Sequence, residues 1–135
     1  MVQLVVNGYY EWDESNKAKI RPFLLKSKAT EKDQQSLLYL ACLYNNAFNE
    51  KIGDEFNHFV VLTMPASDNI SHIHDRRPVF LDENTKTMWL DPTIDFGLCF
   101  KAIISSKAYE GLSFYEVGEI VNSIKYDTDE CILPK

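Results

Sequence analysis

The chain has 135 residues, enough to bury one hydrophobic core but too few for two full-sized domains. Apolar residues make up 45% and charged residues 25%, which excludes a disordered or collagen-like chain. Acidic residues outnumber basic ones 20 to 14, for a net charge of -6. A uniformly basic nucleic-acid surface is therefore excluded, and any polyanion needs a local basic groove.

Targeting signals and cysteines define the expected compartment. The first residues lack a basic leader, and polar Asn7 ends their apolar run, so no secretory signal is indicated. The longest largely apolar stretch, 37–44, is shorter than the about 20 residues of a membrane-spanning helix. The cysteines at 42, 99 and 131 fit reduced thiols better than a disulfide framework. We expect an intracellular protein that does not span a membrane.

The N-terminal half has the patterns of β-strands. Residues 4–6 and 9–12 flank the turn dipeptide Asn7-Gly8, which predicts a β-hairpin. Further expected elements are a strand at 21–26, a surface loop at 29–35, a buried strand at 37–44 containing Cys42, and a strand at 58–63.

The C-terminal half mixes strands with a helix. A polar loop at 66–77 precedes a strand expected at 78–81, and 112–117 reads as a last strand. After Pro92, helical spacing predicts an amphipathic helix capped by Thr93 or Asp95; its apolar residues are Phe96, Cys99, Phe100, Ile103 and Ile104. Since strands predominate and one or two helices pack outside them, we predict an α+β fold with a mostly antiparallel sheet.

The loop segment 71–77 concentrates reactive side chains. His72 and His74 lie two residues apart, and the guanidiniums of Arg76 and Arg77 are adjacent. Such a segment can move protons and hold a phosphate, although a solvated surface loop is the other interpretation. A zinc site from both histidines and Cys99 is disfavoured, because no pair of cysteines has ligand spacing.

Glu11 is a second candidate, because aromatic residues flank it on both sides. If its side chain points inward, burial raises its pKa and allows it to act as a base near neutrality. If it points outward, it is an ordinary strand residue, and strand alternation alone leaves both faces open.

Four blocks of sequence together resemble the SRAP family, the SOS response-associated peptidase proteins. The blocks are 7–12; 59–63 with Ala66; 73–81 with Trp89-Leu90; and 114–122 with 130–134. The resemblance implies one α+β domain over 1–135, with a barrel-like antiparallel sheet and peripheral helices. It also leads us to expect that this domain is incomplete at its N-terminus.

The family resemblance implies a function in the DNA damage response. Proteins of this family recognise abasic sites in single-stranded DNA and shield them through a covalent DNA-protein crosslink. The crosslinking residue is an N-terminal cysteine, which autoproteolytic removal of the initiator methionine exposes. Its amine condenses with the abasic aldehyde, and its thiolate closes a thiazolidine ring. The protein would act in the nucleus of a eukaryote or the cytoplasm of a bacterium, with no cofactor and no metal.

Roles for individual residues follow from the same resemblance. Glu11 matches the acidic residue beside the reacting amine, and His74 matches the histidine that moves protons during ring opening and imine formation. Thr63 matches the hydroxyl that borders the pocket. Arg76 matches a residue that contacts DNA, and Arg77, which stands where methionine is usual, is expected to add a phosphate contact. Glu11 and His74 should converge on one cleft, with Thr63 on its wall.

The start of the chain departs from the family. It begins Met1-Val2, and the family's N-terminal portion with its cysteine has no counterpart here. We therefore expect a fragment or a chain inactive in crosslinking, and whether it is an enzyme stays open. The alternative is a noncatalytic module on the same scaffold that binds single-stranded DNA or aldehydes. Oligomeric state is not predicted.

Overall fold

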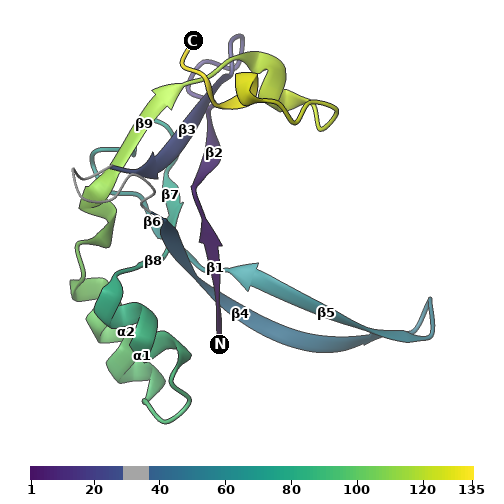
Figure 1. Cartoon of the computed structure of the whole chain (residues 1–135), viewed down its shortest axis with the longest axis vertical. Coiled ribbons are helices and arrows are strands. Elements are labelled where there is room, and N and C mark those ends of the chain that lie inside the picture. The colour runs from purple at the N-terminus through teal and green to yellow at the C-terminus, as the bar shows by residue number, and fades with distance from the viewer. Residues whose placement is uncertain (29–36) are drawn as a thin grey trace. The chain divides into compact units, whose positions relative to one another are not determined.

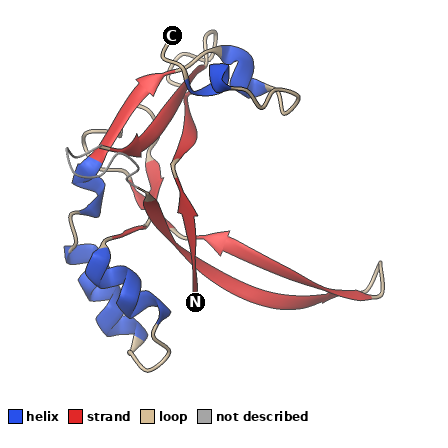
Figure 2. Ribbon diagram, in the orientation of Figure 1, coloured by secondary structure: helices blue, strands red, loops and turns tan. Residues whose placement is uncertain are grey.

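The computed structural model describes residues 1–28 and 37–135. These residues form short helices and mostly antiparallel strand pairs (Figures 1 and 2), which confirms the predicted α+β class. The chain divides into two compact units, each assembled from three segments. Unit 1 comprises Met1–Val5, Tyr39–Met64 and Pro78–Ala108, and unit 2 comprises Val6–Leu38, Pro65–Arg77 and Tyr109–Lys135.

The sheet of unit 1 is built around a long central strand. Strand β4 (Leu38–Asn49) lies between β1 (Val2–Val6) and β5 (Asp54–Val61), and β8 (Phe80–Leu81) also pairs antiparallel with β4. The β4–β5 turn holds Gly53 at a φ of 68°, in the left-handed region that glycine adopts without a steric penalty.

Two helices pack with this sheet around the core of unit 1. Helix α1 spans Glu83–Leu90 and α2 spans Phe96–Ser105. Trp89 is fully buried, and its Nε1–H donates a 2.7 Å hydrogen bond to the Val2 carbonyl. The other buried core residues are Ala41, Val79, Leu81, Cys99 and Ile103.

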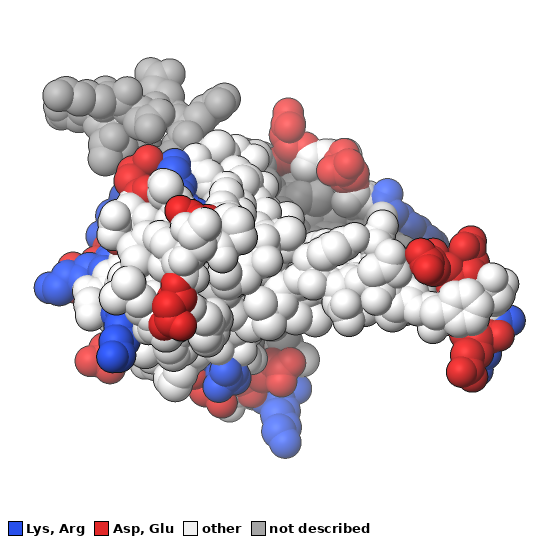
Figure 3. All heavy atoms as spheres, turned by 90° about the horizontal axis from the view of Figure 1, so that it is seen from below, with Lys and Arg blue, Asp and Glu red and all other residues white. Residues whose placement is uncertain are grey.

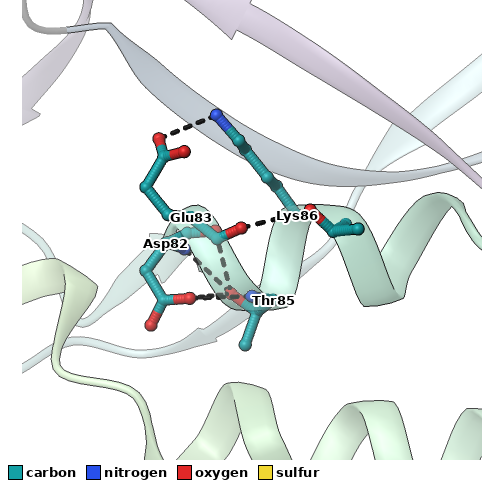
Figure 4. A network of polar contacts seen from close by, with 5 residues as sticks. Asp82, Glu83, Thr85 and Lys86 are labelled. Carbon is teal, nitrogen blue, oxygen red and sulfur yellow. Dashed lines mark hydrogen bonds and ion pairs between the residues drawn. The ribbon is translucent and has the colours of Figure 1, made fainter.

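A capping network fixes the start of α1 (Figure 4). The Asp82 carboxylate accepts the Thr85 N–H at 2.8 Å, and the Thr85 hydroxyl accepts the Asp82 N–H at 2.8 Å. Ser106, the residue that caps the end of α2, donates its hydroxyl to Asp82 at 2.6 Å. The network satisfies backbone groups that a helix end leaves open and joins α1 to α2.

Unit 2 contains a three-stranded antiparallel sheet with the order β2-β3-β9. Its strands are β2 (Gly8–Asp13), β3 (Arg21–Ser27) and β9 (Leu112–Glu116). The described part of unit 2 also includes the short 3-10 helices η2 (Glu119–Asn122) and η3 (Asp129–Ile132); a third, η1 (Ala108–Gly111), precedes β9. Phe23, Leu24 and Leu25 of the central strand are buried.

The C-terminal segment covers one face of the unit 2 sheet. The Tyr10 hydroxyl donates to the Cys131 carbonyl at 3.1 Å, and Trp12 Nε1–H donates to Asn122 Oδ1 at 2.7 Å. Since neighbouring strand residues point to opposite faces, the residues of β2 that alternate with Tyr10 and Trp12 face the other side.

The predicted N-terminal hairpin is wrong. Strands β1 and β2 belong to different sheets, with β1 paired to β4 and β2 paired to β3. Gly8 lies inside β2, where a Cβ atom would stand only 2.7 Å from the Leu25 carbonyl oxygen. Gly8 therefore allows the backbones of β2 and β3 to approach each other closely. The Asn-Gly dipeptide does not form a hairpin turn.

Other predicted elements are confirmed with changed bounds. The strand at 21–26 is β3, the buried strand at 37–44 lengthens into β4, and Cys42 is buried as expected. The last strand is β9, and the segment at 58–63 divides between β5 and the short β6 (Thr63–Pro65), which pairs with β7 (Arg76–Pro78). The loop expected at 29–35 lies outside the described residues.

The helix after Pro92 is α2, and its cap is Asp95, which accepts the Leu98 N–H at 3.0 Å. Of its predicted apolar face, Cys99 and Ile103 are buried, whereas the remaining three side chains are at least 39% exposed. Helix α1 was not predicted. Within the described residues the strands form separate sheets and close no barrel.

Candidate functional site

The candidate site begins on the face of β2 that the C-terminal segment leaves open. Tyr9, Glu11 and Asp13 alternate along this face, and Glu11 lies opposite Phe23 of β3. On the same face Tyr9 lies opposite Leu25, which in turn lies opposite Phe114 of β9. A titratable carboxyl therefore stands on a largely apolar surface.

The loop between β6 and β7 folds over this surface. The His72 ring lies 5.3 Å from the Phe114 ring, centroid to centroid, and Ile70 and Ile73 are buried. Backbone hydrogen bonds order the loop, including Ile70 N–H to Ser67 O at 3.0 Å. Ile70 and Ile73 thus anchor the loop, whereas His72, His74, Asp75 and Arg76 are exposed.

The His74 imidazole acts electrostatically on the Glu11 carboxyl, although 63 positions separate the two residues. Glu11 is half-buried, and this burial is the main cause that raises the pKa of its carboxyl. The nearby His74 imidazole and the Trp12 backbone N–H partly offset that rise in pKa, and the charge of Asp75 adds to it. A carboxyl with a raised pKa beside an imidazole is suited to exchange protons.

His74 has hydrogen-bond partners in both protonation states. Its Nδ1 lies 3.1 Å from the Arg76 N–H, which can only donate, and 3.1 Å from the Arg76 carbonyl, which can only accept. Asp75 Oδ1 lies 3.3 Å from the same nitrogen. Neutral imidazole can therefore accept from Arg76 and carry its proton on Nε2, whereas imidazolium can donate from Nδ1. This arrangement suits a residue that gains and loses a proton.

Tyr9 and Arg77 complete the electrostatic surroundings of Glu11. Burial raises the pKa of the Tyr9 hydroxyl well above its ordinary value, and the Glu11 charge raises it further, while Arg77 acts in the opposite direction. Arg77 itself is only 6% exposed. Sequence reasoning missed Tyr9, but its two-residue spacing from Glu11 on a strand was the available signal.

The two arginines of β7 differ sharply in exposure. Arg76 is exposed and Arg77 is buried, as expected for neighbours that point to opposite sides of a strand. Thr63 is an exposed residue at the start of β6 and belongs to unit 1, whereas Glu11 and His74 belong to unit 2. The wall position proposed for Thr63 stays a prediction.

Asp13, the third residue on the open face of β2, has a structural role. It is buried, forms an ion pair with Arg21, and accepts the Ser15 N–H at 2.9 Å. Hydrogen bonds from Ser15, followed by that from Arg21, lower the pKa of Asp13 to about 2. It is therefore held as a carboxylate and does not exchange protons near neutrality.

The cysteines are poorly placed for chemistry. Cys42, Cys99 and Cys131 are all buried and free of disulfides. Burial raises the pKa of Cys42 and Cys99, which keeps both as unreactive thiols.

Over the ranges 1–28 and 37–135, no group of three His, Cys, Asp or Glu side chains is arranged to hold a metal ion. The same ranges contain no helix of the length and hydropathy needed to cross a membrane.

Fold and site together define an α+β protein with a half-buried glutamate on β2 and an exposed histidine on the β6–β7 loop of the same unit. The family model of the SOS response associated peptidase (SRAP) matches residues 2–124. The chain belongs to the SRAP family, as its sequence blocks predicted.

Known relatives agree with this assignment. The chain is 28% identical to the abasic site processing protein HMCES of Gallus gallus, covering 97% of this chain and 42% of that protein. It is 25% identical to the abasic site processing protein YoqW of Bacillus subtilis, covering 93% and 54%. It thus spans about half the length of these curated relatives. A crystal structure of a protein from Bacteroides thetaiotaomicron shares the fold, with a TM-score of 0.76, 18% identity, and coverage of 96% and 55%.

Proposed function

We propose that this chain is an abasic-site processing module that binds single-stranded DNA and acts on the aldehyde of the ring-opened abasic sugar. The observation that carries the proposal is that half-buried Glu11 and His74 both belong to unit 2 and that the His74 imidazole acts electrostatically on the Glu11 carboxyl. Relatives named as abasic site processing proteins support the same substrate.

The chemistry requires a proton transfer at each stage. Ring opening of an abasic sugar needs a proton on the leaving ring oxygen, and attack of an amine on the aldehyde releases a proton before water is lost. His74, with partners for both of its protonation states, acts as the acid and base at oxygen. Glu11, whose raised pKa makes it a stronger base than an ordinary carboxylate, receives the proton of the attacking amine.

DNA binding is assigned to Arg76. It is exposed and directly follows the His74-Asp75 pair in sequence, so its guanidinium can contact a backbone phosphate next to the reacting sugar. Arg77 is buried, so we now propose that it supports Glu11 and Tyr9 electrostatically and makes no phosphate contact. One exposed arginine on a chain of charge -6 predicts weak, salt-sensitive binding.

A stable crosslink needs an amine and a thiol on one residue. The α-nitrogens of Cys42, Cys99 and Cys131 are amides, and their side chains are buried, so these residues do not meet the requirement. In the 135-residue chain the terminal amine belongs to Met1, or to Val2 after methionine removal. Such an amine gives only a reversible imine. We therefore propose proton transfer and lesion binding as the roles of the residues that the structure describes.

The test compares two histidines of the same loop. The chain should bind a single-stranded oligonucleotide with one abasic site more tightly than the undamaged oligonucleotide, measured by fluorescence anisotropy. His74→Ala should remove most of this preference, whereas His72→Ala, at an exposed position on the same loop, should retain it. Equal affinity of the wild-type chain for both oligonucleotides would contradict abasic-site recognition.

The noncatalytic alternative gives a different pattern. A module that only binds DNA or aldehydes would keep its preference for the abasic oligonucleotide in Glu11→Gln and His74→Ala alike. That result would remove both residues from recognition of the abasic site.

A further inference from the structure

Tyr9 is a titratable residue of the candidate site to which the proton transfers assign no role. It lies two positions before Glu11 on β2, so both side chains point to the open face of the unit 2 sheet, about 7 Å apart along the strand. Tyr9 is half-buried. It lies opposite Leu25, which in turn lies opposite Phe114. Tyr9 therefore belongs to an apolar row of residues directly beside Glu11.

The Tyr9 hydroxyl keeps its proton at neutral pH. Burial is the main cause that raises the pKa of this hydroxyl, and the charge of Glu11 raises it further. The guanidinium of Arg77, which is 6% exposed, acts on Tyr9 in the opposite direction. This positive charge favours electron density on the phenol oxygen, which makes the O–H a better donor. A protonated tyrosine hydroxyl can donate one hydrogen bond, so Tyr9 offers the site a neutral donor.

Attack of an amine on the abasic aldehyde requires such a donor. The carbon–nitrogen bond forms as an electron pair of the C=O double bond moves to the oxygen, which is negatively charged until it is protonated. The chain has a net charge of -6, and Figure 3 shows acidic and basic side chains interspersed around a largely uncharged surface. The general field of the protein therefore does not favour a negative oxygen, which needs a donor close to it.

We propose that the Tyr9 hydroxyl donates a hydrogen bond to the aldehyde oxygen of the ring-opened abasic sugar and stabilises the negative charge that amine attack creates there. This role rests on the proposed function. Both protons of the attacking primary amine pass through Glu11 and His74 to the oxygen, which leaves as water when the imine forms. Tyr9 keeps its own proton throughout, so its task differs from that of the proton-transfer pair.

The substitution Tyr9→Phe tests this role because it removes only the hydroxyl. Methoxyamine, which converts an aldehyde to an oxime, supplies the amine, and mass spectrometry of an abasic single-stranded oligonucleotide follows the product. At saturating protein the wild-type chain should accelerate oxime formation. Tyr9→Phe should react about tenfold more slowly, the effect of one hydrogen bond to a charged oxygen. Its affinity for the oligonucleotide should match that of the wild-type chain, because the hydrogen bond strengthens only as charge develops.

Tyr10→Phe is the matched control. Tyr10 is the next residue of β2, points to the opposite face, and donates its hydroxyl to the Cys131 carbonyl at 3.1 Å. Loss of that hydroxyl should lower stability and leave the rate unchanged. A pH series adds a second readout. The ratio of the Tyr9→Phe rate to the wild-type rate should stay constant from about pH 5 to 8, because the Tyr9 hydroxyl stays protonated over this range.

The outcomes separate the role of Tyr9 from the proposed function. A Tyr9→Phe rate equal to the wild-type rate overturns the role of Tyr9 alone, as do equal losses of rate in Tyr9→Phe and Tyr10→Phe. A shifted pH profile with an unchanged maximum also overturns it, because Tyr9 would then act only through the titration of its neighbours. A wild-type chain that does not accelerate the reaction contradicts the proposed function and the role of Tyr9 together. Circular dichroism should show the same fold for all three chains.

Discussion

The two units use half-buried carboxyl groups in opposite ways. In unit 1, burial opposes ionisation of Asp82, but hydrogen bonds from Ser106 and Thr85 outweigh this effect and lower the pKa of its carboxyl. In unit 2, burial dominates at Glu11, and the pKa of its carboxyl is raised. The difference lies in the number of donors that face each group. A carboxylate with enough donors holds the structure together, whereas one with few donors is available for chemistry.

The units also differ in how their sheets are covered. The C-terminal segment bonds to one face of the unit 2 sheet, and the loop with His72 contacts the other. In unit 1 the antiparallel pair β4–β5 leaves large apolar side chains exposed. The sheet that carries the candidate site is therefore the better covered of the two among the described residues.

The largest expected effect is all-or-none and concerns a polypeptide made of these 135 residues alone, in which the side chains of Cys42, Cys99 and Cys131 are buried. The 135-residue chain, incubated with abasic single-stranded DNA, should form no adduct that survives heating, because its terminal residue offers an amine alone. Borohydride should trap a reducible imine. Denaturing gel electrophoresis with and without borohydride measures both species, and a heat-stable band without reduction would show that this account of the nucleophile is wrong.

The capping network of unit 1 should carry a large part of its stability. Asp82→Ala removes the N-cap of α1 and the bond to Ser106, and should lower the free energy of unfolding by about 1–2 kcal/mol. Glu83→Ala is the matched control, since the Glu83 side chain forms an exposed ion pair with Lys86, and should change stability by a few tenths of a kcal/mol. Urea denaturation measures both. Equal effects would mean that the cap contributes little.

Acidification should change the stability of the protein in opposite directions through two carboxyl groups of β2, those of Asp13 and Glu11. The pKa of Asp13 is lowered to about 2, so its stabilising contribution is present above about pH 4 and is lost as the pH falls toward 2. The pKa of Glu11 is raised, so its protonation on acidification favours the folded state. Asp13→Asn should flatten the acid-induced loss of stability, and Glu11→Gln should make it steeper; thermal unfolding from pH 2 to 6 measures both slopes.

The smallest expected effect concerns Arg76. Arg76→Glu should weaken binding to every single-stranded oligonucleotide and reduce the slope of log affinity against log salt by about one. Buried Arg77 should behave differently, because Arg77→Gln removes no phosphate contact and leaves the slope unchanged. Anisotropy titrations at several salt concentrations test this, and an unchanged slope in Arg76→Glu would remove Arg76 from the DNA interface.

Local sequence patterns predicted the strands and helices whose formation depends mainly on their own residues. Short runs rich in apolar residues located β3 and β9, and Asp95 with its helical spacing located α2. The hairpin prediction failed because Gly8 is required by a distant neighbour, Leu25. Helix α1 was missed because its main stabilising contacts, at Trp89 and through Asp82 to Ser106, come from outside the helix.

The site was only partly predictable, because some of its features depend on contacts with residues distant in the sequence. Glu11 and His74 stand in blocks that identify the family, so the sequence singled out both. Alternation left the direction of Glu11 open, and only the positions of Tyr10 and Trp12 against the C-terminal segment decide it. The burial of Arg77 depends on packing in three dimensions, which adjacent arginines in a sequence do not reveal.

The most direct test of the central claim supplies the missing aminothiol from solution. Free cysteine reacts with an abasic aldehyde to form a thiazolidine, and the wild-type chain should accelerate this reaction on single-stranded DNA. Glu11→Gln and His74→Ala should each lose about a hundredfold of that acceleration, whereas His72→Ala should retain it. Mass spectrometry of the oligonucleotide over time gives the rates. A wild-type rate equal to that of cysteine and DNA alone would contradict the assignment of Glu11 and His74 as the proton-transfer pair.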